Sequence, residues 1–245
     1  MSIMSTDENT GRKDVSKRVE RAHRILDVAA ALILRWGYNK TTIDDVAREA
    51  GVAKGTIYLH WKTREDLFRA LIRREKVNMA EDVRQRILDD PVGATLRGIL
   101  KHLALVLMKR PLMKALILRD MDVIGKLAHG GNGTIDYVEK LTGFNSYLET
   151  LRDHGLIRAD LNLKVQMYIF NAIFMGFFLT MPLMPEGFIL SDEELADLMA
   201  ETVHCTLEGN RSISADDLKA VSLAFMQYLD HALAVAKEHL QQELK

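Results

Sequence analysis

Apolar residues recur every three or four positions along most of the chain, a spacing that predicts helices. The first clear stripe lies between Val19 and Trp36, and its predicted buried residues are Ile25, Ala29, Leu32, Ile33 and Trp36. Val, Ile and Thr do not alternate with polar residues over any long stretch. Leu, Ala, Met, Glu, Lys and Arg dominate, and these are good helix formers. The pattern therefore predicts an all-α protein.

Capping and turn residues divide this pattern into separate helices. Gly37 ends the first helix, and Thr41 begins the second with Asp44 as its capping-box partner. Later helices are predicted at about 54–60, 63–88, 92–109, 112–127, 134–155, 162–181, 191–208 and 214–243. Residues 1 to about 15 carry no apolar stripe and are predicted to be disordered.

Two short helices meet at Gly51 and Val52, which is the layout of a helix-turn-helix. The residues predicted to pack these helices together are Ile43, Val46, Ala47, Val52 and Ile57. In this motif the second helix enters the DNA major groove. With Ile57 turned inward, Gly55 lies on roughly the opposite side, where the backbone can approach the groove.

The polar residues around this turn are candidate DNA contacts. Lys54 and Thr56 lie near a helix N-terminus, from which Lys can reach guanine and a Thr methyl can touch thymine. The other candidates are suited to phosphates: Thr42, Tyr58, His60, Lys62 and Arg64. The alternatives are core packing or surface filling for Tyr58 and His60, and solvated charge for Lys62 and Arg64.

The segment from Ile25 to about Leu71 resembles the TetR family of bacterial transcriptional regulators. The motifs that carry the resemblance are Trp36-Gly37-Tyr38, Thr41-Thr42-Ile43, Val46-Ala47, Ala50-Gly51-Val52, Lys54-Gly55-Thr56-Ile57-Tyr58 and His60-Trp61-Lys62. Trp61 stands where the family usually has Phe, and it keeps an aromatic core anchor. By position, the family's DNA contacts would fall on Thr42, Lys54, Gly55, Thr56, Tyr58, His60, Lys62 and Arg64.

The resemblance implies a three-helix head on a larger helical bundle. It further implies a homodimer that binds a pseudo-palindromic double-stranded operator. A small-molecule effector would release this homodimer from the DNA. The family's dimer helices would correspond to about 162–181 and 191–208, and the segment 214–245 would be an extra C-terminal helix. We therefore expect a flexible basic arm over 1–18, a DNA-binding domain over 19–76 and a ligand-binding and dimerisation domain over 77–245.

The charge distribution supports this division of the chain. The whole chain has a net charge of −1, which alone argues against a nucleic-acid partner. Residues 1–76 hold 16 Lys and Arg against 11 Asp and Glu, a net charge of +5, whereas residues 77–245 hold 17 against 23, a net charge of −6. A basic N-terminal part fits contact with DNA phosphates.

The stretch from Met167 to Met184 is almost wholly apolar. It is marginal in length for a membrane span, which needs about 20 apolar residues, so a buried helix or a subunit interface explains it better. The candidate residues for an apolar ligand pocket are Met121, Met167, Phe170, Phe174, Met175 and Phe178. Ordinary core packing or a dimer interface is the alternative. The polar N-terminus lacks a secretory signal, so a cytoplasmic protein without a membrane partner is expected.

Other functions find little support in the sequence. The single Cys205 and the scattered His residues predict no metal site, and no cofactor motif is present. No serine lies in a nucleophile elbow, so we do not expect an enzyme, although an enzyme on an all-α scaffold is one alternative. A ligand-independent DNA-binding protein of chromosome organisation or division is another. The leading hypothesis is a ligand-responsive repressor.

Overall fold

The computed structural model describes residues 6–125, 144–209 and 212–244, with side chains from residue 16 onward. The described residues form two compact units. The head unit comes from Met1–Val77, Ala115–Gly130 and Ala234–Lys245, and the body unit from Asn78–Lys114 and Gly131–Leu233. The described residues are helical almost throughout, which confirms the predicted fold class.

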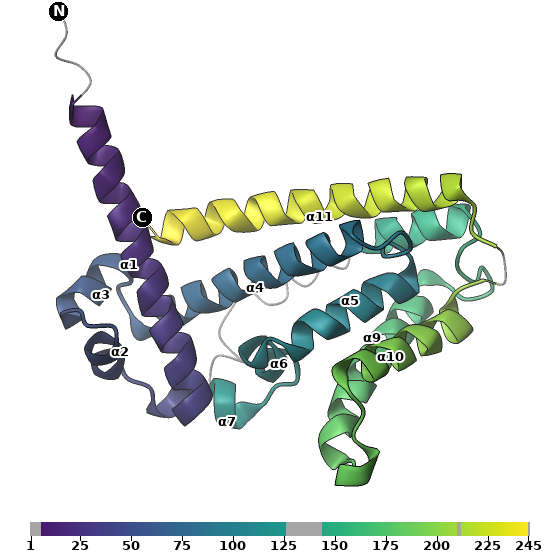
Figure 1. The fold of residues 1–245 in the computed structure, drawn as a ribbon, viewed down its shortest axis with the longest axis horizontal. Helices are drawn as coiled ribbons and strands as arrows, with labels where there is room; N and C mark the ends of the chain where they lie inside the picture. The colour runs from purple at the N-terminus through teal and green to yellow at the C-terminus, as the bar shows by residue number, and fades with distance from the viewer. Residues whose placement is uncertain (1–5, 126–143, 210–211, 245) are drawn as a thin grey trace, which may run out of the picture. The chain divides into compact units, whose positions relative to one another are not determined.

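The head unit is a small helical domain (Figure 1). Its elements are α1 (Thr6–Trp36), η1 (Tyr38–Lys40), α2 (Ile43–Glu49), α3 (Lys54–His60), the first part of α4 (Arg64–Leu88), α7 (Met121–Ile124) and the end of α11 (Ala215–Leu244). Four predicted stripe residues of α1 are buried: Ile25, Ala29, Leu32 and Ile33. Val46, Ile57, Trp61 and Phe68 are buried as well, so the helix-turn-helix is built on a hydrophobic core.

Three expectations for the head were wrong. Helix α1 begins at Thr6 and not at Val19, because its first turns are charged and have no apolar stripe to reveal them. Trp36 is 36% exposed and lies under the Arg35 guanidinium, so it is not a core residue. The N-cap of α2 is Thr42, with Asp45 as its capping-box partner. Thr41 is buried instead, and its hydroxyl donates to the Gly37 carbonyl (2.9 Å).

The body unit contains the remaining helices. They are the end of α4, α5 (Leu96–Met108), most of α6 (Pro111–Ile117), a helix over 144–153, α9 (Leu163–Thr180), η3 (Met181–Leu183), η4 (Glu186–Phe188), α10 (Asp192–Leu207) and the first part of α11. The helix predicted over 112–127 is broken in two. The break covers residues 118–120, where Arg119 has a left-handed φ of 55° and Asp120 caps α7. Residues 134–143 of another predicted helix lie outside the described residues.

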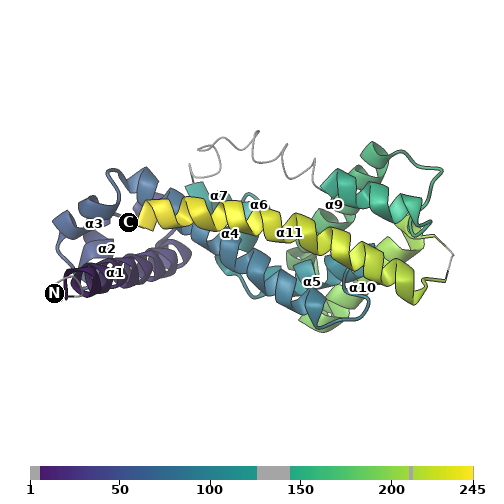
Figure 2. The same ribbon diagram turned by 90° about the horizontal axis from the view of Figure 1, so that it is seen from above.

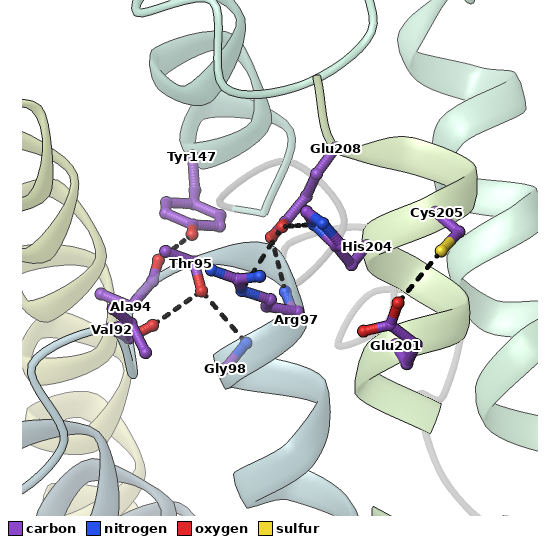
Figure 3. A network of polar contacts seen from close by, with 10 residues as sticks. All are labelled: Val92, Ala94, Thr95, Arg97, Gly98, Tyr147, Glu201, His204, Cys205 and Glu208. Carbon is purple, nitrogen blue, oxygen red and sulfur yellow. Dashed lines mark hydrogen bonds and ion pairs between the residues drawn. The ribbon is translucent and has the colours of Figure 1, made fainter. Parts of the chain in front are cut away.

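Within the body unit, Glu208 joins the end of α10 to the start of α5 (Figure 3). One carboxylate oxygen accepts the backbone N–H of Arg97 (2.9 Å), and the other lies 2.8 Å from His204 Nδ1. Nearby, the Tyr147 hydroxyl donates to the Ala94 carbonyl, and burial raises the pKa of Tyr147 well above its usual value. A buried carboxylate at a helix N-terminus is stabilised by free N–H groups and by the helix dipole. Glu208 therefore holds the end of α10 against the start of α5.

We expect Glu208→Ala to lower the free energy of unfolding by about 2 kcal/mol, because hydrogen bonds to a charged group are worth about 1.5–3 kcal/mol. Urea denaturation followed by circular dichroism measures the loss. The matched control is Glu201→Ala in α10, the helix that Glu208 follows, where the side chain is exposed and accepts from the Cys205 thiol (3.3 Å). Equal stability of the two variants would contradict the role given to Glu208.

Candidate DNA-binding site

Helix α3 presents one buried residue and an exposed side. Ile57 is fully buried, whereas Tyr58 is 44% and Leu59 71% exposed. Gly55 and Leu59 are four residues apart and therefore lie on the same side of the helix. A Cβ at Gly55 would meet nothing within 4 Å, so the α3 backbone there is open to a close approach. This arrangement confirms the predicted orientation of Ile57 and leaves the opposite side free for a groove.

The turn before α3 is fixed by backbone geometry. Gly51 has a φ of +64°, a conformation that glycine adopts without strain, and the Val52 N–H donates to the Ala47 carbonyl (3.0 Å). Ala47, Gly51 and Val52 thus set the angle at which α2 and α3 cross. The exposed side of α3 is therefore held at a defined angle to α2.

Lys54 begins α3 and is exposed. Its ammonium lies 2.8 Å from the Asp44 carboxylate, and that hydrogen bond raises the pKa of Lys54 above its usual value. Both side chains are about half exposed or more, so the pair is open to exchange with another anion. Lys54 can therefore turn from Asp44 to a base edge or phosphate.

Thr42 does not offer the open phosphate site that its position at the N-terminus of α2 suggested. Its hydroxyl donates to the Asp45 carboxylate (2.6 Å) and accepts the Asp45 backbone N–H (3.2 Å). The Thr42 backbone N–H also points to that carboxylate (3.3 Å). The capping box thus occupies the Thr42 hydroxyl and backbone N–H and the Asp45 backbone N–H, so these groups are already paired within the protein.

Two further candidates are engaged inside the head. The Arg64 guanidinium lies 4.1 Å from the centre of the Tyr38 ring and donates to the Tyr38 carbonyl. His60 is half-buried, with its ring centre 5.1 Å from that of Trp61. Burial of the imidazole, together with nearby Arg18, lowers the pKa of His60, and the nearby Leu244 backbone only partly offsets this. Packing therefore accounts for both residues.

The remaining candidates differ in exposure. Lys62 is exposed and Thr56 is half-buried. Leu59, which the sequence did not indicate as a DNA contact, and Arg18 of the basic N-terminal segment also lie at this surface. Leu59 projects from the exposed side of α3, and the guanidinium of Arg18 on α1 donates to the Leu59 carbonyl (3.0 Å). Leu59 was recognisable from its position four residues after Gly55, whereas the contact of Arg18 joins segments far apart in the sequence.

The candidate ligand residues fall into two groups. Met167, Phe170, Phe174 and Phe178 share the buried side of α9, and the rings of Phe174 and Phe178 lie 5.2 Å apart. Met175 is half-buried on the same helix. Met121 lies on α7 in the head unit and is 46% exposed. Four of the candidate ligand residues therefore share the buried side of α9, whereas Met121 belongs to the head unit.

A separate groove lies in the body unit between α4 and α5. Its lining is mainly polar and contains none of the candidate ligand residues: Asp82, Gln85, Arg86, Asp89, Asp90, His102, Val106 and Lys109. Within the described residues, no group of three or more His, Cys, Asp or Glu side chains is arranged to hold a metal ion.

Comparison with known proteins bears directly on the head. Residues 25–71 match the family model described as bacterial regulatory proteins, tetR family. The N-terminal part of the chain therefore carries a domain that matches the TetR family. The matched residues include α2, α3 and the start of α4, so the TetR-family domain coincides with the helix-turn-helix in the structure.

Named relatives match part of the chain. The HTH-type transcriptional regulator AcrR of Shigella flexneri is 30% identical over 123 residues, which cover 48% of this chain and 57% of that protein. The fatty acid metabolism regulator protein of Bacillus subtilis is 37% identical over 68 residues, 26% of this chain and 34% of that protein. The chain thus spans between a third and three fifths of these two relatives.

Solved structures extend the likeness to most of the fold. The fatty acid degradation regulator FadR from Bacillus halodurans has a TM-score of 0.55 at 18% identity, covering 75% of this chain and 94% of that one. The SmeT–triclosan complex has a TM-score of 0.54 at 16% identity, covering 78% and 93%. At these identities the likeness shows a shared fold, a helix-turn-helix joined to a helical domain.

Proposed function

We propose that the protein is a cytoplasmic DNA-binding transcriptional regulator, a homodimeric repressor that a small, largely apolar ligand releases from a pseudo-palindromic operator. The observation that carries the proposal is the exposed side of α3, where Lys54, Gly55 and Tyr58 are accessible on a domain that matches the TetR family. Repression needs no catalysis, only a difference in DNA affinity between the ligand-free and ligand-bound states.

An apolar stripe on α9, left exposed by the described residues, supports the homodimer. Its members are exposed at helical spacing: Val165, Tyr168, Leu179 and, just past the helix end, Leu183. Gly176 lies in the same stripe, and a Cβ there would meet nothing within 4 Å. The segment Leu163–Leu183 is apolar enough to span a membrane, yet only 22% of its most apolar window is buried. A second copy of the chain, packed on this stripe, accounts for the apolar exposure without a membrane.

The chemistry of α9 supports an apolar ligand. Its buried side is lined by Met167 and three Phe side chains, a combination that adapts to ligands of different shape. One structural relative is a complex with triclosan, and one sequence relative is a regulator of fatty acid metabolism. We therefore propose hydrophobic small molecules as the effector class of this protein.

The test of DNA binding uses DNA from upstream of the protein's own gene. We expect Lys54→Ala and Tyr58→Ala each to weaken binding at least about tenfold, since a good base contact contributes that much discrimination. Fluorescence anisotropy at several salt concentrations measures the affinity, and Lys54→Ala should also reduce the salt dependence if Lys54 contacts a phosphate. Lys109→Ala, an exposed lysine of the body unit, is the control. Wild-type affinity in the double variant would refute the assignment of these two residues.

A further inference from the structure

The last turns of α11 belong to the head unit, although they are the most distant part of the chain in sequence. The head unit includes residues from Ala234 onward. Figures 1 and 2 both show the C-terminal end of α11 beside the start of α4. We call the segment from Ala234 to Leu244 the C-terminal clasp. A segment that packs on a DNA-binding domain can influence how that domain meets DNA.

The C-terminal clasp is attached to the head by apolar and charged contacts. Leu240 and Leu244 are 7% and 3% exposed, so their side chains are buried. Glu243 forms an ion pair with Arg73 of α4. Burial raises the pKa of Glu243, and the charges of Arg73 and Arg69 oppose this rise. The attachment is therefore partly desolvated, unlike an ordinary exposed surface pair.

The same segment reaches the recognition helix. The backbone of Leu244 lies close enough to His60, the last residue of α3, to raise the pKa of its imidazole. On another side, Arg18 of α1 donates to the carbonyl of Leu59 (3.0 Å). Helix α3 has only seven residues, too few for a helix to be stable without tertiary contacts. Its C-terminal end is thus held by residues from both extremes of the chain.

We propose that the C-terminal clasp positions the recognition helix α3 for operator binding. The inference rests on the proposed DNA-binding function and extends it to a segment outside the matched family domain. When the clasp is attached, the end of α3 is already ordered before DNA arrives. When it is detached, DNA binding has to order that end, which weakens the affinity. Arg73, Glu243 and Leu244 are positioning residues in this proposal.

A purely electrostatic role for Glu243 makes the opposite prediction. Glu243 carries a negative charge in the unit that binds DNA, so replacing it by a cation should strengthen binding if charge alone matters. Under the clasp hypothesis, Glu243→Arg places two guanidinium groups against each other and opens the segment. The sign of the change in DNA affinity therefore separates the two roles.

The experiment compares three full-length variants by fluorescence anisotropy with upstream DNA. We expect Glu243→Arg to weaken binding about tenfold, a loss of about 1.4 kcal/mol, despite its added positive charge. Glu238→Arg makes the same charge change at an exposed position of the same segment and should bind as tightly as the wild type or tighter. The double variant Arg73→Glu with Glu243→Arg reverses the ion pair, keeps the net charge of the wild type and should recover the lost affinity.

Hydrogen exchange of the α3 amides gives a readout without DNA. We expect faster exchange in Glu243→Arg than in the wild type and in Glu238→Arg, with overall helicity unchanged. Unchanged α3 exchange, or a Glu243→Arg variant that binds DNA as tightly as Glu238→Arg, would overturn the positioning role. Failure of the wild type to bind any upstream fragment would instead refute the proposed function, and the exchange data would still decide whether the segment orders α3.

Discussion

Replacing Leu179 by Arg is expected to leave the protein monomeric and to weaken operator binding by about a thousandfold. Leu179 lies in the exposed stripe of α9 and is 52% exposed in the single chain. In a two-fold symmetric interface each substitution occurs twice, so two charges would enter one apolar contact. Burying a charge without a partner costs several kcal/mol, more than a dimer of moderate affinity can tolerate.

The loss of DNA affinity follows from the loss of the second head. A monomer keeps one recognition helix and can read one half-site only. Specific affinities of dimers typically exceed non-specific affinities by about 10³–10⁷, and most of that difference depends on engaging both half-sites. Leu179→Arg should therefore lower operator affinity much more than any single substitution on α3.

Sedimentation equilibrium gives the oligomeric state, and anisotropy with full and half operators gives the affinity. The matched control is Leu223→Arg, because Leu223 on α11 is 59% exposed and lies outside the α9 stripe. We expect this control to remain dimeric and to bind the full operator normally. A Leu179→Arg variant that sediments as a dimer, or a monomeric wild type, would rule out the α9 stripe as the dimer interface.

The helix pattern was predictable wherever local signals agreed. Helix α3 spans Lys54–His60 as expected, because Gly51 fixes the preceding turn and Ile57 marks the buried side. The start of α1 was missed because a charged helix without an apolar stripe resembles a disordered segment in sequence. The break after Ile117 was missed because a left-handed Arg119 carries no sequence signal of the kind that glycine gives.

The candidate DNA site shows where local reasoning ends. The exposure of Lys54, Gly55 and Tyr58 followed from the helix spacing alone. The surroundings of His60 and Arg64 could not be predicted in this way. Leu244, which lies near His60, is 184 residues away in the chain, and Tyr38, which contacts Arg64, is 26 residues away. A one-dimensional pattern gives the direction of a side chain from its helix, but it cannot name the distant segment that meets it there.

Gly37 joins the end of α1 to α7 by a close backbone approach within the head unit. Its φ is +79°, in the region that favours glycine. A Cβ at this position would lie 2.4 Å from the backbone oxygen of Asp122, and a backbone atom cannot rotate away as a side chain does. Gly37→Ala therefore has to displace α7 or the end of α1, in addition to adopting a φ of 79° with a ψ of 159°, a backbone region essentially confined to glycine.

We expect Gly37→Ala to lower the free energy of unfolding by about 3 kcal/mol or more. The glycine-only backbone conformation contributes about 1–3 kcal/mol, and overpacking typically contributes about 1–3 kcal/mol. Chemical denaturation followed by circular dichroism measures the total, provided that one transition is observed.

Gly51→Ala is a comparison variant that lacks the close backbone contact. Gly51 has a similar φ of +64°, but a Cβ there would meet nothing within 4 Å. Its substitution should therefore cost only the conformational part, about 1–2 kcal/mol. The difference between the two alanine variants then measures the contact of Gly37 with Asp122 together with the more restricted backbone conformation of Gly37. Equal losses would mean that α7 moves aside freely, and that the end of α1 is not held by this contact.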